Sequence, residues 1–271
     1  MPTPPAFAPL AHDLRDHIIA YYEALGKRLD TPAGLLTLDT NSVLAAGRGR
    51  LLLRLLAEAG AGPVAGRRVL DLGAGFGALA LYYASLGAEV VAVDPNIHRM
   101  QVALTIATQR GLEVSALAAQ AQSLPLPDAS FDLVLANNSL CFVLDRGDYR
   151  HALKEIHRVL RPGGWTAMRN PNRLHPRDQF TGLPLLAMLS PDLAGRVTHA
   201  LGRDRSEVRL SSPGSAVRQL RRAGFTDVRW RAQPGRRLGA RLAGYHHVLG
   251  RRPPAVGRTL PTAAMGGHDP T

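Results

Sequence analysis

The sequence predicts an α/β fold in which a mostly parallel sheet is covered by helices on both faces. Three observations support this prediction. Residues 69–72, 88–94 and 131–136 are largely apolar and bounded by turn residues, which is typical of strands buried on both faces. Segments with apolar residues at helical spacing separate these runs. A glycine-rich turn follows the first run, as in a strand–turn–helix unit.

The first strand leads into the turn Gly73-Ala-Gly-Phe-Gly77. We expect Gly73 to allow a sharp bend, Gly75 to leave bare main chain where a ligand approaches, and Gly77 to let the next helix pack closely. Asp94 ends the second strand, where a carboxylate can accept hydrogen bonds from a ribose diol. The pattern therefore predicts a site for a nucleoside-containing cofactor.

The glycine pattern alone leaves two cofactors open, because Gly73, Gly75 and Ala78 also satisfy the dinucleotide fingerprint. Asp71 stands two residues before the first glycine. A carboxylate at this place repels a pyrophosphate but attracts a cation, such as the amino group of an amino acid. S-adenosylmethionine carries such an amino group, so Asp71 favours it over NAD.

The later segments extend the same architecture. Residues 149–160 have apolar residues at helical spacing, which indicates a helix lying on the sheet, and Arg161-Pro-Gly-Gly ends it. Residues 215–223 predict a further helix. Residues 225–233 and 244–250 predict an antiparallel strand pair that closes the sheet.

Three ordered segments resemble class I S-adenosylmethionine-dependent methyltransferases, particularly the small-molecule branch that includes the ubiquinone and menaquinone biosynthesis enzymes. They are residues 69–94, residues 124–136 (Leu-Pro-Leu-Pro-Asp-Ala-Ser-Phe-Asp-Leu-Val-Leu-Ala) and residues 153–164 (Leu-Lys-Glu-Ile-His-Arg-Val-Leu-Arg-Pro-Gly-Gly). The resemblance covers residues 65–170. It implies a Rossmann-like, seven-stranded, mostly parallel sheet with an antiparallel last strand, N-terminal helices and a helical insertion after strand five.

The resemblance also implies S-adenosylmethionine as the cofactor and assigns residues to its parts. They are Asp71, Gly73, Ala74, Gly75 and Gly77 for the methionine moiety, Asp94 for the ribose, Pro95, Asn96, Gln120 and Ala121 around the adenine, and Asn137 near the sulfonium. Many relatives have Gly-Asp-Ala-Glu where this chain has Ala-Gln-Ala-Gln at residues 119–122. Gln120 thus replaces an adenine-binding aspartate, and its amide oxygen can still accept a hydrogen bond.

The positions of turn residues and apolar segments along the chain predict its domain organisation. We expect an N-terminal helical cap over residues 1–60, a methyltransferase domain over 61–252 and a flexible tail over 253–271. In the cap, the Pro-rich residues 1–10 are expected to lack order. Ile18, Ile19, Tyr22 and Leu25 form one apolar stripe and residues 51–56 another. Tyr21 and Tyr22 either pack in the core or reach the substrate.

Residues 170–214 form a long insertion after the fifth strand, with a short apolar helix expected around 183–189. Long insertions at the ligand-binding edge of a sheet are often functional, so we interpret this one as a lid; a helix that simply packs on the sheet is the alternative. His175 lies here and is our candidate general base for a hydroxyl acceptor, because imidazole titrates near working pH. His98 and His151 fall on predicted helix surfaces.

Composition narrows the class of protein. Cys141 is the single cysteine, no Cys and His cluster has metal-ligand spacing, and no apolar run is long enough to span a bilayer. We therefore expect a cytoplasmic enzyme without a metal. The sequence does not determine the oligomeric state.

The net charge of +12 is uneven: residues 1–155 hold 13 basic and 15 acidic side chains, whereas residues 156–271 hold 20 and 6. The basic half is either a solvated surface or a face for an anionic partner. The favoured function is methyl transfer by in-line displacement to a small or lipid-like metabolite. The alternatives are a methyltransferase acting on RNA or protein, or a non-catalytic nucleotide-cofactor-binding protein. Sparse aromatic residues, 5% of the chain, disfavour nucleic acid as the partner.

Overall fold

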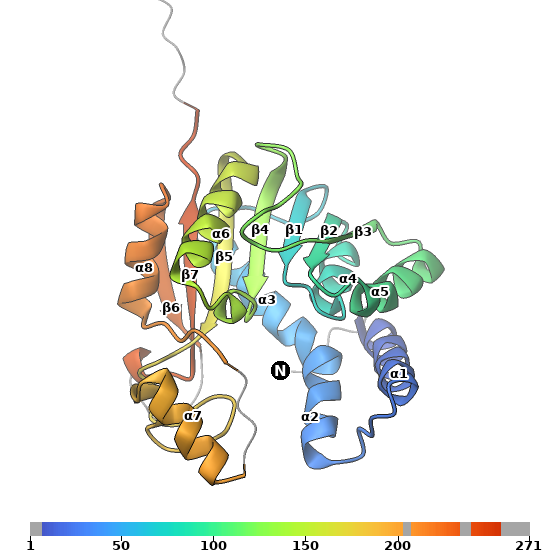
Figure 1. The fold of residues 1–271 in the computed structure, drawn as a ribbon. Helices are drawn as coiled ribbons and strands as arrows, with labels where there is room; N and C mark the ends of the chain where they lie inside the picture. The colour runs from blue at the N-terminus through green and yellow to red at the C-terminus, as the bar shows by residue number, and fades with distance from the viewer. Residues whose placement is uncertain (1–6, 203–206, 234–239, 256–271) are drawn as a thin grey trace, which may run out of the picture.

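A computed structural model describes residues 7–202, 207–233 and 240–255. Seven strands form one sheet in the order β3-β2-β1-β4-β5-β7-β6 (Figure 1). The strands are β1 (Arg68–Leu72), β2 (Glu89–Asp94), β3 (Val114–Ala118), β4 (Phe131–Asn137), β5 (Leu160–Pro171), β6 (Thr226–Ala232) and β7 (Tyr245–Arg251). The helices are α1 (Ala8–Ala24), α2 (Pro32–Asn41), α3 (Val43–Glu58), α4 (Ala78–Ala84), α5 (Ile97–Arg110), α6 (Arg146–Val159), α7 (Pro191–Ala200) and α8 (Pro213–Arg222). None of the helices in the described residues is long and apolar enough to cross a membrane.

The strand directions confirm the predicted fold class. Strands β1 to β5 pair in parallel, and β7 lies antiparallel between β5 and β6. The strand order reverses at β1, which has β2 on one side and β4 on the other. In open α/β sheets, ligands bind beside such a reversal, outside the carboxyl ends of the strands.

Alternating residues of each strand pack into two separate cores. In β1, Val69 faces a core shared with α1, α3, α4 and α5, whereas Leu70 and Leu72 face the core under α6 and α8. Strand β4 divides in the same way, with Leu133 and Leu135 on the α3 side. Figure 1 shows α6 and α8 on one face of the sheet and α3 passing behind the other. Burial on both faces explains why these strands read as continuous apolar runs.

The predicted helix at 149–160 is confirmed as α6. Asp145 caps it by accepting hydrogen bonds from the backbone N–H groups of Gly147 and Asp148, at 2.6 and 3.0 Å. A carboxylate at this position compensates N–H groups that have no partner within the helix. The helix ends at Val159, and Leu160 begins β5 directly, so the Arg161-Pro-Gly-Gly segment lies in the first part of the strand.

Two expectations for the N-terminal region are wrong. Helix α1 begins at Ala8, and Phe7 is fully buried, with its ring centroid 5.5 Å from that of Tyr82 in an edge-to-face arrangement. Phe7 and Leu10 are therefore part of the core, while residues 1–6 lie outside the described residues. Leu25 is 55% exposed, because α1 ends before it and the chain turns away. The tail beyond residue 255 is likewise outside the described residues.

The insertion after β5 also differs from its prediction. Around residues 183–189 the structure has only a short 3₁₀ turn, η3 (Leu186–Met188), whereas its one α-helix among the described residues is α7. The start signal of α7 is local: Ser190 accepts a 3.4 Å hydrogen bond from the N–H of Leu193, and a proline occupies the first turn. The prediction of a helix around residues 183–189 is wrong because it rests on apolar composition alone.

Candidate functional site

The glycine turn after β1 has the bend that its sequence predicts. Gly73, Gly75 and Gly77 have φ angles of 74°, 57° and 72°, a region that side-chain-bearing residues rarely adopt. The N–H groups of Gly73 and Ala74 both donate to the carbonyl oxygen of Val93, at 2.7 and 3.0 Å. These bonds hold the turn against the end of β2.

Each of the three glycines has a different spatial reason for lacking a side chain. A Cβ at Gly73 would lie 2.1 Å from the Cβ of Ser139, and one at Gly77 would lie 2.3 Å from the Cβ of Ala103 in α5. A Cβ at Gly75 would meet nothing within 4 Å. The main chain at Gly75 therefore borders open space, as expected where a ligand lies on bare backbone.

Asp94 is fixed by two backbone hydrogen bonds. Its Oδ2 accepts from the N–H of Gly75 and its Oδ1 from the N–H of Asn96, both at 2.9 Å. A carboxylate oxygen accepts more than one hydrogen bond, so each retains a lone pair for a hydroxyl. Asp94 thus orders the turn and can still bind a diol.

Asp71 is a buried carboxyl group without a counter-ion. Its side chain is 2% exposed, and Oδ2 has no hydrogen-bond partner in the described part of the chain. The pKa of Asp71 is raised to about 7, chiefly by burial; a hydrogen bond from the N–H of Ala80 opposes this rise and the charge of Asp94 adds to it. A cationic group bound beside Asp71 would favour its ionised form.

Four polar side chains form a row on the α3 side of the sheet. Asn137 in β4 pairs in register with Arg169 in β5, which pairs with His247 in β7. Strand alternation puts these three residues on the same face as Asp71, because Val69, Leu135, Ala167 and Leu249 all belong to the core on that face. Oδ1 of Asn137 is buried and has no partner among the described residues. Sequence reasoning identified Asp71 and Asn137 but missed Arg169 and His247.

The residues assigned to the adenine lie around the ends of β2 and β3. Ala118 pairs in register with Asp94, which places the following segment beside the glycine turn. Pro95 and Gln120 are exposed, while Asn96 caps α5 by accepting a 3.3 Å hydrogen bond from the N–H of Arg99. Ala121 is half-buried.

Gln122, which the sequence did not single out, has a buried Oε1 with no partner in residues 7–202, 207–233 and 240–255. It belongs to the Ala-Gln-Ala-Gln run that replaces the family's Gly-Asp-Ala-Glu, so that departure was the available signal.

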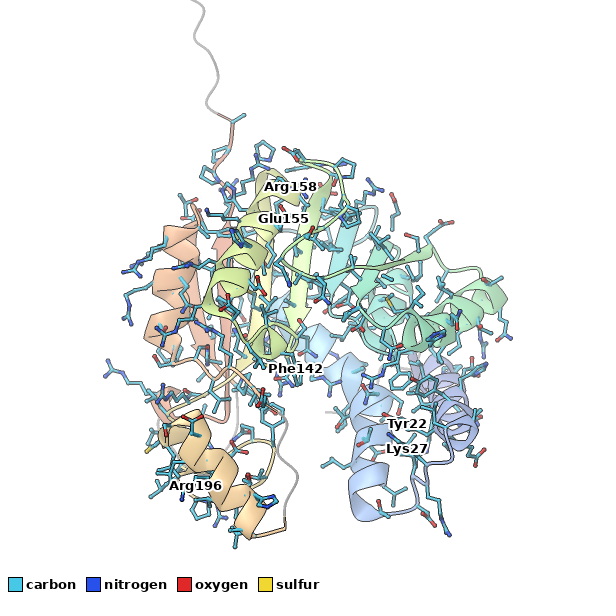
Figure 2. The ribbon with its side chains drawn as sticks, viewed as in Figure 1. Tyr22, Lys27, Phe142, Glu155, Arg158 and Arg196 are labelled. Carbon is cyan, nitrogen blue, oxygen red and sulfur yellow. The ribbon has the colours of Figure 1, made fainter. Side chains whose placement is uncertain are left out.

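The two tyrosines of α1 pack on the glycine turn. The ring centroid of Phe76 lies 5.2 Å from that of Tyr21 and 5.8 Å from that of Tyr22. Figure 2 shows Tyr22 among the N-terminal helices, at the edge of the sheet where Phe142 also lies. Tyr21 and Tyr22 therefore have a packing role, and their rings cover one side of the glycine turn.

His175 lies in the insertion and contacts its own segment. Its Nδ1 is 2.6 Å from the carbonyl oxygen of Arg177, 3.1 Å from the N–H of Arg177 and 2.8 Å from Nε2 of Gln179. The side chain of Gln179 in turn occupies the space where a Cβ of Gly244 would be. The insertion is thus anchored beside the start of β7.

A wide cavity lies on the opposite face of the sheet. It has a volume of about 1130 Å³, and α6, α7, α8 and residues 207–211 enclose it. Its lining is basic, with Arg146, Arg150, Lys154, Arg173, Arg209 and Arg222 against Asp192 and Glu207. It contains none of the residues assigned to the cofactor, so the nucleoside site and this cavity are separate features.

Part of the chain is similar to known proteins. The methyltransferase domain family matches residues 70–168. The chain is 34% identical over 149 residues to the demethylmenaquinone methyltransferase of Renibacterium salmoninarum, covering 55% of this chain and 56% of that protein. It is 44% identical over 101 residues to the demethylmenaquinone methyltransferase of Thermus thermophilus, covering 36% and 44%.

The chain thus spans about half the length of these curated relatives. The crystal structure of a SAM-dependent methyltransferase from Methanosarcina mazei aligns with a TM-score of 0.54 at 20% identity, covering 73% of this chain and 97% of that one. That structure has the same fold.

Proposed function

We propose that residues 70–168, which match the methyltransferase domain family, form an S-adenosylmethionine-dependent methyltransferase domain and that the protein methylates a small, lipid-like acceptor. The proposal rests on the glycine turn, whose main chain borders open space at Gly75, and on two nearby carboxyl groups in different environments. Asp94 is held 2.9 Å from the N–H of Gly75, while Asp71 is buried with an oxygen that has no partner in the described residues.

The residues present fit the cofactor. We propose that the main chain at Gly73, Ala74, Gly75 and Gly77 borders its methionine part and that Asp71 faces its amino group. Asp94 would bind the ribose, Pro95, Asn96, Gln120 and Ala121 would surround the adenine, and Asn137 would lie near the sulfonium. When bound, S-adenosylmethionine supplies an electrophilic methyl group. The protein's own task is to align the acceptor with that group and to exclude water.

The acceptor class is inferred from the relatives and from the edge of the sheet. Two relatives are named demethylmenaquinone methyltransferases, whose name specifies a lipid-like quinone. At the same edge, the insertion exposes apolar side chains, with Leu185 at 55% and Met188 at 49%. Exposed apolar groups beside a ligand site favour an apolar ligand. We propose that residues 170–214 act as a lid and residues 1–60 as a cap over the domain at 61–252.

His175 remains our proposed base for an acceptor that enters with a neutral hydroxyl. A proton on Nδ1, donated to the carbonyl oxygen of Arg177 2.6 Å away, leaves the lone pair on Nε2 free to accept a proton. The alternative tautomer, with Nδ1 accepting from the N–H of Arg177 at 3.1 Å, has no free lone pair. His175 can therefore act as a base only in the tautomer that carries its proton on Nδ1.

A second candidate, methylation of RNA or protein, is favoured only by the basic cavity between α6, α7 and α8. One experiment separates the candidates. The protein is incubated with methyl-labelled S-adenosylmethionine and fractionated host extract, and label is followed into organic solvent, nucleic acid or protein. We expect label in the organic phase, and label confined to nucleic acid or protein would refute the lipid-like acceptor.

A further inference from the structure

Arg169 is a buried arginine at the carboxyl end of β5, next to Asn137 on the acceptor side of the proposed site. Its side chain is 8% exposed. Its guanidinium donates from Nε and Nη2 to Oε1 of Gln233, at 3.2 and 3.1 Å, and stacks 3.5 Å over the ring of Tyr245. Gln233 and Tyr245 are uncharged side chains. They hold the guanidinium group in place but do not neutralise its positive charge.

A second arginine approaches the same place from α3. Arg48 donates from Nη2 to the carbonyl oxygen of Thr40, while its Nε is buried without a partner among the described residues. The pKa of Arg48 is lowered to about 10, chiefly by burial and also by the positive charge of Arg169, against a raising effect of Tyr245 and Tyr83. Helix α3, which carries Arg48, packs against β5, which carries Arg169. Neither arginine is among the ion pairs found in the described part of the chain.

His247 and Cys141, two titratable groups near Arg169, supply no negative charge near neutral pH. His247, opposite Arg169 in β7, is fully buried, and neither ring nitrogen has a partner in the part of the chain that the structure describes. Burial, together with the charge of Arg169, lowers the pKa of His247 to about 3. Burial raises the pKa of Cys141 to about 12, so its thiol stays neutral.

Buried like charges without a counter-ion are unfavourable, and proteins rarely retain them unless a bound group compensates them. Arg169 lies beside Asn137, the residue assigned to the sulfonium, and on the same face as Asp71. We infer that Arg48 and Arg169 bind an anionic oxygen of the methyl acceptor. The inference rests on the proposed function and specifies its substrate class: an acceptor with an ionised phenolic or carboxylic oxygen.

Binding the anion has a direct consequence for the chemistry. Two guanidinium groups favour the ionised form of a phenol, so its proton leaves to solvent as the acceptor binds. The ionised acceptor is the stronger nucleophile. It forms a bond to the methyl carbon as the methyl–sulfur bond breaks, and the electron pair of that bond goes to sulfur. No base is then needed at the moment of transfer, and His175 is free for a structural role.

The test uses pairs of small probes with and without the charge. The full chain, saturated with S-adenosylhomocysteine, is titrated by calorimetry with 4-nitrophenol and with its uncharged methyl ether, 4-nitroanisole, at a pH where the phenol is ionised in water. A parallel pair, 4-nitrobenzoate and its methyl ester, distinguishes a phenolate from a carboxylate site. We expect the anion of at least one pair to bind about tenfold or more tighter than its neutral partner, which is a typical effect of one charge-assisted hydrogen bond.

Variants locate the effect. Arg169→Gln and Arg48→Gln should each remove most of the preference, whereas Arg169→Lys and Arg48→Lys should retain part of it because the charge remains. Arg150→Gln, in the basic cavity on the other face, should leave the preference unchanged. The affinity for S-adenosylhomocysteine, measured on every variant, reports whether the fold is intact.

The outcomes are distinguishable. If the wild-type protein shows no preference for either anion, including the case in which no probe binds, the anion site does not exist. A preference that survives both glutamine variants, or that Arg150→Gln removes, also contradicts the assignment. If S-adenosylhomocysteine fails to bind while the preference persists, the proposed function fails and the anion site stands.

Discussion

The N–H of Gly75 donates a 2.9 Å hydrogen bond to Oδ2 of Asp94, which joins the glycine turn after β1 to the end of β2. The other carboxylate oxygen holds the N–H of Asn96 at the same distance. One side chain therefore fixes both segments between which the cofactor is expected to lie. This relationship links the order of the turn to the affinity for the ligand.

Replacing Asp94 should weaken cofactor binding more than stability. Asp94→Asn keeps one acceptor oxygen but loses the charge and one backbone partner. Hydrogen bonds to charged groups contribute about 1.5–3 kcal/mol, so we expect at least about a tenfold loss of affinity for S-adenosylhomocysteine by calorimetry. Asp128→Asn, at a carboxylate that is paired with Arg158 far from the turn, is the control. Equal affinities in the two variants would argue against the assigned role of Asp94.

The three glycines should respond differently to alanine. Gly73→Ala and Gly77→Ala place a Cβ about 2 Å from another Cβ, so both should unfold at clearly lower temperature. Gly75→Ala meets no atom within 4 Å and should cost only about 1 kcal/mol for its positive φ, while cofactor affinity falls sharply. Gly111→Ala, with a similar φ and equal space, controls for backbone strain. Unchanged affinity in Gly75→Ala would show that the cofactor does not approach this backbone.

The buried carboxyl of Asp71 predicts a pH dependence of stability. Its folded pKa of about 7 exceeds the ordinary 3.8, so the folded state binds the proton more tightly than the unfolded chain does. Stability from this group is therefore greatest below about pH 4 and is lost as pH rises towards 7. Asp71→Asn should flatten that part of the curve in denaturant titrations. A wild-type curve of the same shape as the variant's would contradict the assignment.

The same group predicts how cofactor affinity changes with pH. If Asp71 pairs with the cofactor's amino group, binding requires the carboxylate and releases a proton below about pH 7. Affinity should then rise by up to about tenfold per pH unit between about pH 5.5 and pH 7. Calorimetry in buffers of different ionisation enthalpy counts the released protons. Asp71→Asn should release none.

His175 separates two routes of activation. If the arginine pair binds an ionised acceptor, His175→Gln should retain turnover within about threefold of the wild-type rate and leave its pH profile unchanged. If His175 is the base, the loss should reach about a hundredfold or more, with the acidic limb of the profile removed. Steady-state rates across pH distinguish the two results, and the second would count against the anion site.

The exposed apolar side chains of the insertion should matter only to the acceptor. Leu185→Gln with Met188→Gln should raise KM for the acceptor several-fold, because apolar contact is lost, while affinity for S-adenosylhomocysteine stays the same. Leu86→Gln, at a 38% exposed leucine before β2, is the matched surface control. An unchanged KM for the acceptor in the double variant would contradict the proposed role of the insertion as a lid.

Parts of the site could be predicted from sequence because their constraints act locally. Gly73, Gly75 and Gly77 each occupy a positive φ, a requirement that selects glycine and is therefore visible in the sequence. Asp94 follows at the fixed distance of one helix and one strand. The seven-stranded order followed from the family resemblance rather than from residue patterns.

Other parts depended on long-range register and could not be predicted. Arg169 and His247 are 78 positions apart in sequence, and only the pairing of β5 with β7 brings them to one face. Arg48 lies on α3, which precedes the sheet in sequence and packs against β5. The helix in the insertion was missed because its capping residue, Ser190, is a weaker signal than the apolar run before it.

The most direct test of the central claim is the affinity of the purified chain for S-adenosylmethionine and for NAD, measured side by side by calorimetry on the wild-type protein and on Asp94→Asn. The account predicts that S-adenosylmethionine binds the wild type, that the variant binds it at least about tenfold more weakly, and that NAD binds neither protein comparably. Tighter binding of NAD than of S-adenosylmethionine would contradict it.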